Sequence, residues 1–120
     1  MIIGTVTNNG VPMITLSVAG ALWSGIIDTG FNGDLELPEE LRGQLNAQYI
    51  GRLSSLLAGG QQVDEDVYLV EFPFDGRTVR AEATFADSRE ILIGTQLLSS
   101  YRLEIDFPQQ TVRLESTYAG

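Results

Sequence analysis

The chain has 120 residues, 43% of them hydrophobic, which fits one domain spanning 1–120 with a packed core of its own. It contains no cysteine and no histidine, which excludes disulfides, thiolate nucleophiles, Ser-His or Cys-His catalysis and imidazole metal ligands. Sixteen acidic residues against seven basic ones leave a net charge of −9, which argues against nucleic acid and anionic membranes as partners.

Alternation of apolar and polar residues with a period of two dominates the chain and predicts short β-strands. The turns between them are marked by residues that tolerate positive φ, most clearly Asn9-Gly10 and Asp75-Gly76. In chain order, the expected strands are 1–7, 11–18, 21–28, 49–57, 63–74, 77–85, 91–93, 101–107 and 111–115. This many strands at close spacing indicates an all-β fold, either a closed barrel or a sandwich.

Helix signals are limited to two short segments. Pro38 is followed by acidic residues, which suits the first turn of a short helix near 38–45. The segment 95–99, directly after Gly94, is expected to form one or two helical turns.

Nothing in the sequence resembles a targeting or membrane segment. The N-terminus lacks a basic region followed by an apolar stretch, so we expect no signal peptide. The longest apolar runs are only a few residues, too short to span a bilayer. We therefore expect a cytoplasmic protein.

The triplet Asp28-Thr29-Gly30 is the first candidate for chemistry. It follows Ile26-Ile27, so a carboxylate stands at the exit of an apolar strand, where a perturbed pKa is expected. Gly30 would let another backbone approach closely. The alternative is an ordinary turn in which Asp28 caps its own backbone, and the triplet alone favours this alternative.

A second segment, Ile91-Leu92-Ile93-Gly94 followed by 95–98, changes that balance. Three apolar residues and a glycine suit a strand that passes closely beneath a site, although a buried strand with a glycine turn has the same pattern. The two segments, in this order and spacing, resemble the retropepsin-like aspartic peptidases from about residue 3 to about residue 107. The variant Asp28-Thr29-Gly30-Phe31, followed by Leu35-Glu36-Leu37-Pro38, is similar to the small prokaryotic branch of these peptidases.

The resemblance implies a retropepsin-like barrel and an aspartic endopeptidase without cofactor or metal. In this family two carboxylates flank one water, one acting as general base and the other as general acid. The chain has one such triplet, because Asp87-Ser88 is followed by Arg89. The second carboxylate would therefore be Asp28 of another copy, so the implied partners are a second chain in a homodimer and a polypeptide substrate.

Other roles follow from the resemblance, residue by residue. Thr29 would bond across the pair of catalytic loops, and Gly30 would leave room for the substrate backbone. Leu92 matches a position that lines the central specificity pockets. The segment Leu57-Ala58-Gly59-Gly60-Gln61 is the candidate for the tip of the hairpin flap that closes over the substrate, and its alternative is a plain hairpin turn.

Three positions depart from the family pattern. Asn32 stands where retroviral members usually have an Asp that binds the substrate main chain, and Thr95 stands where they usually have the Arg that pairs with it. Phe31 replaces a smaller residue next to the catalytic triplet and is assigned to substrate binding with Asn32. These departures leave open a catalytically weak or inactive peptide-binding module on the same fold.

Two further alternatives remain at the level of sequence. The first is an unrelated all-β domain in which Asp28 only caps a turn. The second is a hard-metal site built from nearby acids, but the spacing of known calcium loops is absent and we interpret these acids as solvated surface charge. The acids concerned are Asp34, Glu36, Glu39 and Glu40.

Overall fold

The computed structural model describes residues 1–56 and 59–117, which form ten β-strands and one 3-10 helix. The elements are β1 (Ile2–Val6), β2 (Pro12–Val18), β3 (Ala21–Ile27), β4 (Leu35–Pro38), η1 (Glu39–Leu41), β5 (Gln48–Leu56), β6 (Gln62–Phe74), β7 (Arg77–Ala86), β8 (Ile91–Ile93), β9 (Tyr101–Asp106) and β10 (Thr111–Ser116). Within the described residues, every predicted strand is present with its ends shifted by no more than one residue. The apolar segment at 35–37 forms the additional strand β4.

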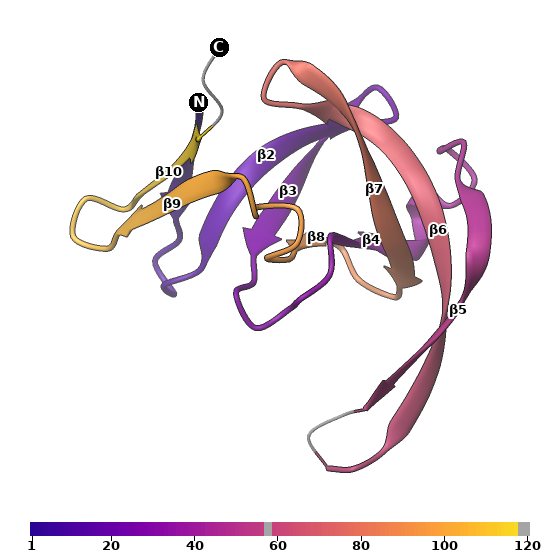
Figure 1. Ribbon diagram of the computed structural model, residues 1–120. Helices are drawn as coiled ribbons and strands as arrows, with labels where there is room; N and C mark the ends of the chain where they lie inside the picture. Colours follow the sequence, from indigo (N-terminus) through magenta and orange to yellow (C-terminus); the bar gives the residue numbers. More distant parts are fainter. Residues whose placement is uncertain (57–58, 118–120) are drawn as a thin grey trace.

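The strands form one sheet in the order β5-β6-β7-β4-β8-β3-β2-β1-β10-β9. Neighbouring strands are antiparallel except for two parallel pairs, β3 with β8 and β4 with β7. The sheet folds over on itself, so that the long β6–β7 hairpin lies opposite β2 and β3, and β2 contacts β6 (Figure 1). The all-β prediction is confirmed.

The core lies between these two parts of the sheet and is filled by one face of each strand. Period-two alternation is visible in β2, where every second side chain is buried, as expected for a strand with one solvated face. Each fully buried Leu, Ile or Val contributes about 1.5–3 kcal/mol relative to an exposed position. The largest fully buried side chains are Leu35, Leu37, Leu41, Ile91, Ile93, Leu114, Val112 and Pro38.

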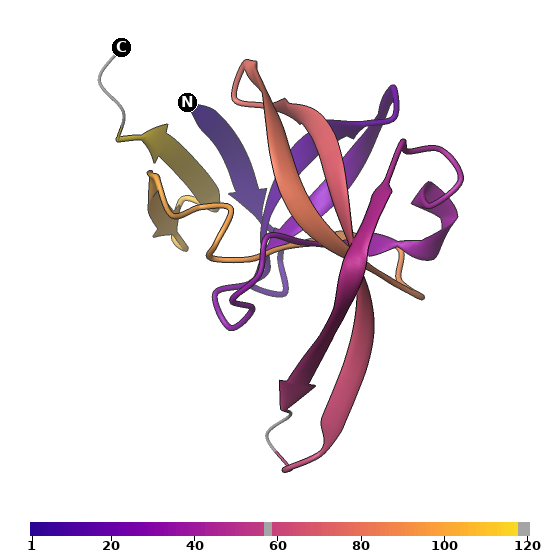
Figure 2. The same ribbon diagram turned by 45° about the vertical axis from the view of Figure 1, so that its right-hand side comes forward.

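The β5–β6 hairpin extends beyond the rest of the sheet, and its far end projects at the bottom of Figure 2. The pairing register shifts between Tyr49 and Gly51, and Gly51 has φ of 140°. Such a bulge bends and twists the strand that carries it. The predicted flap tip falls at this projecting end, although Leu57 and Ala58 lie outside the described residues.

Of the two predicted helices, the first is shorter than expected and the second does not form. Around 38–45 only the 3-10 helix Glu39–Leu41 forms, and Gly43, a poor helix former, follows it closely. The segment 95–99 is a series of turns, because the chain enters β9 at Tyr101 after only i→i+3 hydrogen bonds. No helix among residues 1–56 and 59–117 is long and apolar enough to cross a membrane.

Candidate active site

Asp28 directly follows β3, and its backbone continues the parallel pairing with β8. Its N–H donates to the carbonyl of Ile93 at 2.9 Å. Its carboxylate oxygen Oδ1 accepts from the N–H of Gly30 at 3.0 Å, and its carbonyl accepts from the N–H of Phe31 at 3.1 Å. The capping turn considered from sequence is therefore present, and it fixes a half-buried carboxylate at the end of a core strand.

Gly94 joins this turn to the end of β8. Its N–H donates to the carbonyl of Asp34 at 2.9 Å, and the next N–H, of Thr95, donates to the carbonyl of Phe31 at 2.9 Å. A Cβ on Gly94 would lie only 2.0 Å from the carbonyl oxygen of Gly33, so the close approach requires glycine at this position. The two segments singled out in the sequence thus lie against each other.

The remaining predicted site residues lie either in the exposed loop after Asp28 or in the half-buried part of β8. Thr29, Gly30 and Asn32 are exposed in the loop after Asp28. Leu92 is half-buried in β8, between Ile26 of β3 and Glu36 of β4. The exposed loop is thus open to a partner, and Leu92 lies on the sheet face that leads to Asp28.

Thr95, which directly follows Gly94, makes a weak polar contact with the Asp28 loop. Its hydroxyl donates a long hydrogen bond of 3.4 Å to the carbonyl of Phe31, the same oxygen that accepts from its backbone N–H. It therefore supports the loop through the main chain without a charge.

Phe31 turns its ring back onto the same loop. A Cβ on Gly33 would come within 2.7 Å of the ring atom Cε1, so the aromatic ring lies on the glycine. Phe31 also lines a small cavity of about 70 Å³ together with Leu53 of β5 and Val67 of β6. The ring thus occupies space between the Asp28 loop and the β5–β6 hairpin.

Gly59 and Gly60, which were predicted to form the flap tip, are exposed at the projecting end of the hairpin, and Gly60 has φ of +81°. The side chains that reach the Asp28 loop come from farther back, at Leu53 and Val67. Sequence reasoning missed both, although the alternation in the expected strands 49–57 and 63–74 carried the necessary signal.

Glu36 is the residue whose environment differs most from the expectation. It is half-buried, and its pKa is raised by burial, by the negative charge of Glu65 and by that of Asp28. Glu36 is therefore only partly solvated, which differs from the interpretation of it as a fully solvated surface charge. Asp34 also has a structural partner, since its Oδ2 accepts from the N–H of Glu82 at 2.9 Å.

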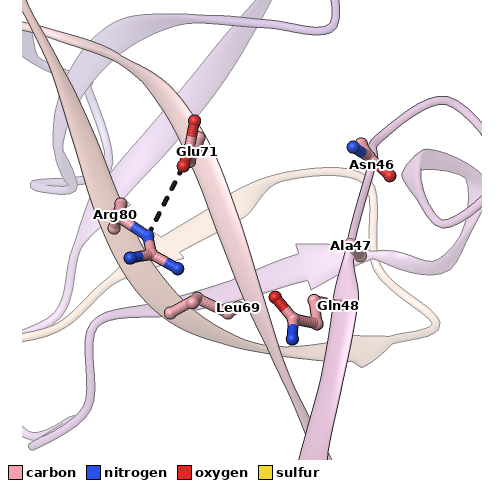
Figure 3. Close-up of a pocket in the computed structure, with 6 residues that line it drawn as sticks. All are labelled: Asn46, Ala47, Gln48, Leu69, Glu71 and Arg80. Atoms are coloured by element: carbon pink, nitrogen blue, oxygen red, sulfur yellow. Dashed lines mark ion pairs between the residues drawn. The ribbon is translucent and has the colours of Figure 1, made fainter.

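A larger cavity of about 500 Å³ lies elsewhere on the β5–β6–β7 part of the sheet (Figure 3). Its lining is mainly polar, and Arg80 pairs with Glu71 across 3.4 Å. None of the predicted site residues lines it. Among the described residues, no group of three or more His, Cys, Asp or Glu side chains is arranged to hold a metal ion.

No protein-family model matches the sequence, and no curated protein matches it. Among solved structures, a retropepsin-like aspartic protease from Rickettsia conorii aligns with a TM-score of 0.68 and 19% identity, covering 94% of this chain and 88% of that one. The EIAV protease in complex with the inhibitor HBY-793 aligns with a TM-score of 0.60 and 18% identity, covering 79% and 91%.

The protease of simian foamy virus (mac) gives a similar result, with a TM-score of 0.58, 21% identity and coverage of 72% of this chain and 91% of that one. Identities at this level speak to the fold alone. Together with the all-β sheet and the crossing of β8 beneath the Asp28 turn, they establish that this chain has the retropepsin-like fold.

Proposed function

We propose that the chain is an aspartic endopeptidase that acts as a homodimer, with Asp28 of each copy as the two catalytic carboxylates. The observation that carries the proposal is the position of Asp28. Its turn follows a core strand and is hydrogen-bonded to the glycine end of β8, within a retropepsin-like fold. Such a turn holds a carboxylate rigidly, as a catalytic group requires.

The proposed chemistry needs only water and the two carboxylates. The ionised Asp28 takes a proton from water, whose oxygen attacks the scissile carbonyl carbon, while the protonated Asp28 of the second copy donates to the carbonyl oxygen. Collapse of the tetrahedral diol breaks the C–N bond as one carboxylate takes a proton from a diol hydroxyl and the other gives its proton to the leaving nitrogen, which restores the singly protonated pair. Two carboxylates that flank one water share one proton, so the protonation steps belong to the pair.

The homodimer follows from the single triplet in the chain. A two-fold axis beside Asp28 would bring the two exposed Thr29 side chains together, where each could bond the opposite loop. Gly30 is also exposed there and has no side chain to obstruct the main chain of an extended polypeptide.

Substitution of Asp28 by Asn tests this function. The amide keeps the size of the carboxylate and its acceptor for the Gly30 N–H, but it cannot act as a general base. We expect loss of cleavage of a peptide library across acidic to neutral pH, with an unchanged free energy of unfolding and unchanged dimerisation. Cleavage at the wild-type rate by this variant would contradict the proposal.

A peptide-binding module without activity is the second candidate, and the position of Phe31 favours it. The ring fills space beside the Asp28 loop, where a substrate side chain could otherwise enter. A binding measurement alongside the peptide digest separates the two candidates, since binding without any cleavage product would support the module.

A further inference from the structure

A row of four side chains crosses the sheet next to Asp28. Strand pairing aligns Ile26 of β3 with Leu92 of β8, Leu92 with Glu36 of β4, and Glu36 with Thr84 of β7. Paired residues on adjacent strands point to the same face of a sheet, and Asp28 stands two residues after Ile26, again on that face. The row therefore leads directly to the catalytic carboxylate.

The burial pattern confirms which face this is. The four side chains of the row are all half-buried, whereas their direct sequence neighbours, such as Ile27 and Ile93, are fully buried in the core. The row thus forms the floor beside Asp28, facing away from the core. Glu36 is its single charged member.

The β5–β6 hairpin covers this floor with one of its two faces. Leu53 pairs with Glu65 and shares its face with Val67, and both Leu53 and Val67 line a cavity with Phe31. Glu65 lies on this face because it pairs with Leu53, and its negative charge contributes to the raised pKa of Glu36.

On the opposite face of the hairpin, the carboxylates have partners. There Arg52 forms an ion pair with Asp66 at 3.5 Å, and the Ser54 hydroxyl donates to the carboxylate of Asp64. On the inner face, neither Glu36 nor Glu65 has an ion-pair or hydrogen-bond partner within the described part of the chain. This face of the hairpin, together with Glu36 of the floor, therefore presents uncompensated negative charge.

We propose that Glu36 makes this site selective for polypeptides with an arginine or lysine side chain beside the bond that is cut. The inference rests on the proposed peptidase function and deepens it by naming the substrate class. In a homodimer each copy would contribute one Glu36, so a cationic side chain could be selected on either side of the bond.

The chemistry of the surroundings suits this occupant. Leu92, Leu53 and Val67 supply apolar surface for the aliphatic stem of arginine or lysine, and the carboxylates of Glu36 and Glu65 would receive its charged end. A cation would also offset the repulsion among Glu36, Glu65 and Asp28, which a neutral side chain would leave in place. The gain would be larger than on the open surface because the floor is partly shielded from water.

The test compares cleavage of two matched sets of extended peptides near neutral pH. One set carries arginine or lysine next to the cleaved bond, and the other carries glutamine or methionine at the same place. For the wild-type chain we expect kcat/KM to be about tenfold or more higher for the cationic set, the factor of one charge-assisted hydrogen bond. Glu36→Gln should remove most of this preference, measured as the ratio of kcat/KM for the cationic set to kcat/KM for the neutral set within the variant itself.

Glu104→Gln is the matched control, because it removes the same charge from an exposed position on β9 and should keep the preference. Equal cleavage of both sets by the wild-type chain, or a preference unaffected by Glu36→Gln, would overturn the inference and leave the peptidase function standing.

A binding measurement with the same peptides and the Asp28→Asn variant separates the two proposals. If the wild-type chain cleaves none of the peptides, but the cationic peptides bind more tightly and this preference depends on Glu36, the peptidase function fails and the ligand class stands. If neither cleavage nor a Glu36-dependent binding preference is found, both proposals fail.

Discussion

Gly94 and Gly33 touch through the main chain, since a Cβ on Gly94 would lie 2.0 Å from the carbonyl oxygen of Gly33. Neither backbone can withdraw easily. Gly94 is held by its hydrogen bond to Asp34, and the Gly33 carbonyl accepts from the N–H of Gln96 at 3.1 Å. The loop that carries Asp28 is thus held against the end of β8 at a point where there is no room for a side chain.

Gly94→Ala should therefore destabilise the protein strongly. The added methyl group would force the backbone of 31–34 away from β8, and we expect a loss of about 3 kcal/mol in the free energy of unfolding. Gly43→Ala is the control, because nothing lies within 4 Å of its Cβ position and a change of about 0.5 kcal/mol or less is expected. Urea denaturation measures both, and equal stability of the two variants would contradict this account of Gly94.

The sequence predicted the strands well, and it singled out two segments that the structure brings together, for identifiable physical reasons. A strand such as β2 has one buried face, so its alternation is written in the sequence. Asp28 and Gly94 were found because a carboxylate after an apolar strand and a glycine after another are local signals. Glu36 was misjudged because its burial depends on strands β7 and β8, which pair with β4 from distant parts of the chain.

The two predicted helices show that local sequence signals can also suggest elements that the fold does not form. Pro38 and the acids after it are good signals for a helix start, but a helix also needs length, and Gly43 follows within a few residues. After Gly94, the N–H groups of Thr95 and Gln96 donate to the carbonyls of the Asp28 loop, an interaction that local sequence does not reveal.

The proposed sharing of the site between two copies predicts a kinetic effect in mixed dimers. When wild-type and Asp28→Asn chains are combined in equal amounts and allowed to exchange, only dimers with two wild-type chains retain both carboxylates. We expect about a quarter of the activity of the same total amount of wild-type chain, the statistical share of such dimers. An activity that falls linearly, to about one half, would indicate a site complete within one chain.

Phe31→Ala should lower the stability of the protein and open the site to larger peptide side chains. The ring is half-buried against Gly33, so we expect a loss of about 1–2 kcal/mol, less than for a fully buried phenylalanine. Removing the ring also enlarges the small cavity shared with Leu53 and Val67, so peptides with bulky side chains should be cleaved or bound better. Phe31→Leu is the matched variant and should retain most of the packing. Unchanged selectivity for bulky peptides in Phe31→Ala would show that the ring does not limit access.

Protonation of Glu36 should make a pH-dependent contribution to stability. Its pKa in the folded protein lies above the unfolded value of 4.5, so the folded state holds the proton more tightly and stability falls as pH rises from about 4.5 through the raised pKa. Glu36→Gln, which cannot ionise, should therefore be more stable than the wild-type chain at pH 7, and this difference should vanish near pH 4. The gain is expected to be modest, because the side chain is still partly solvated.

Glu39 provides a control of opposite sign for the same experiment. Its hydrogen bond with Arg42 lowers its pKa, so its contribution to stability is present above the unfolded pKa and is lost as pH falls. Glu39→Gln should therefore be slightly less stable than the wild-type chain at pH 7, with the difference fading in acid. Urea unfolding of both variants at several pH values gives the two curves. If Glu36→Gln, like Glu39→Gln, were less stable than the wild-type chain at pH 7, the ionised Glu36 would not be destabilised by burial and by the negative charges of Asp28 and Glu65.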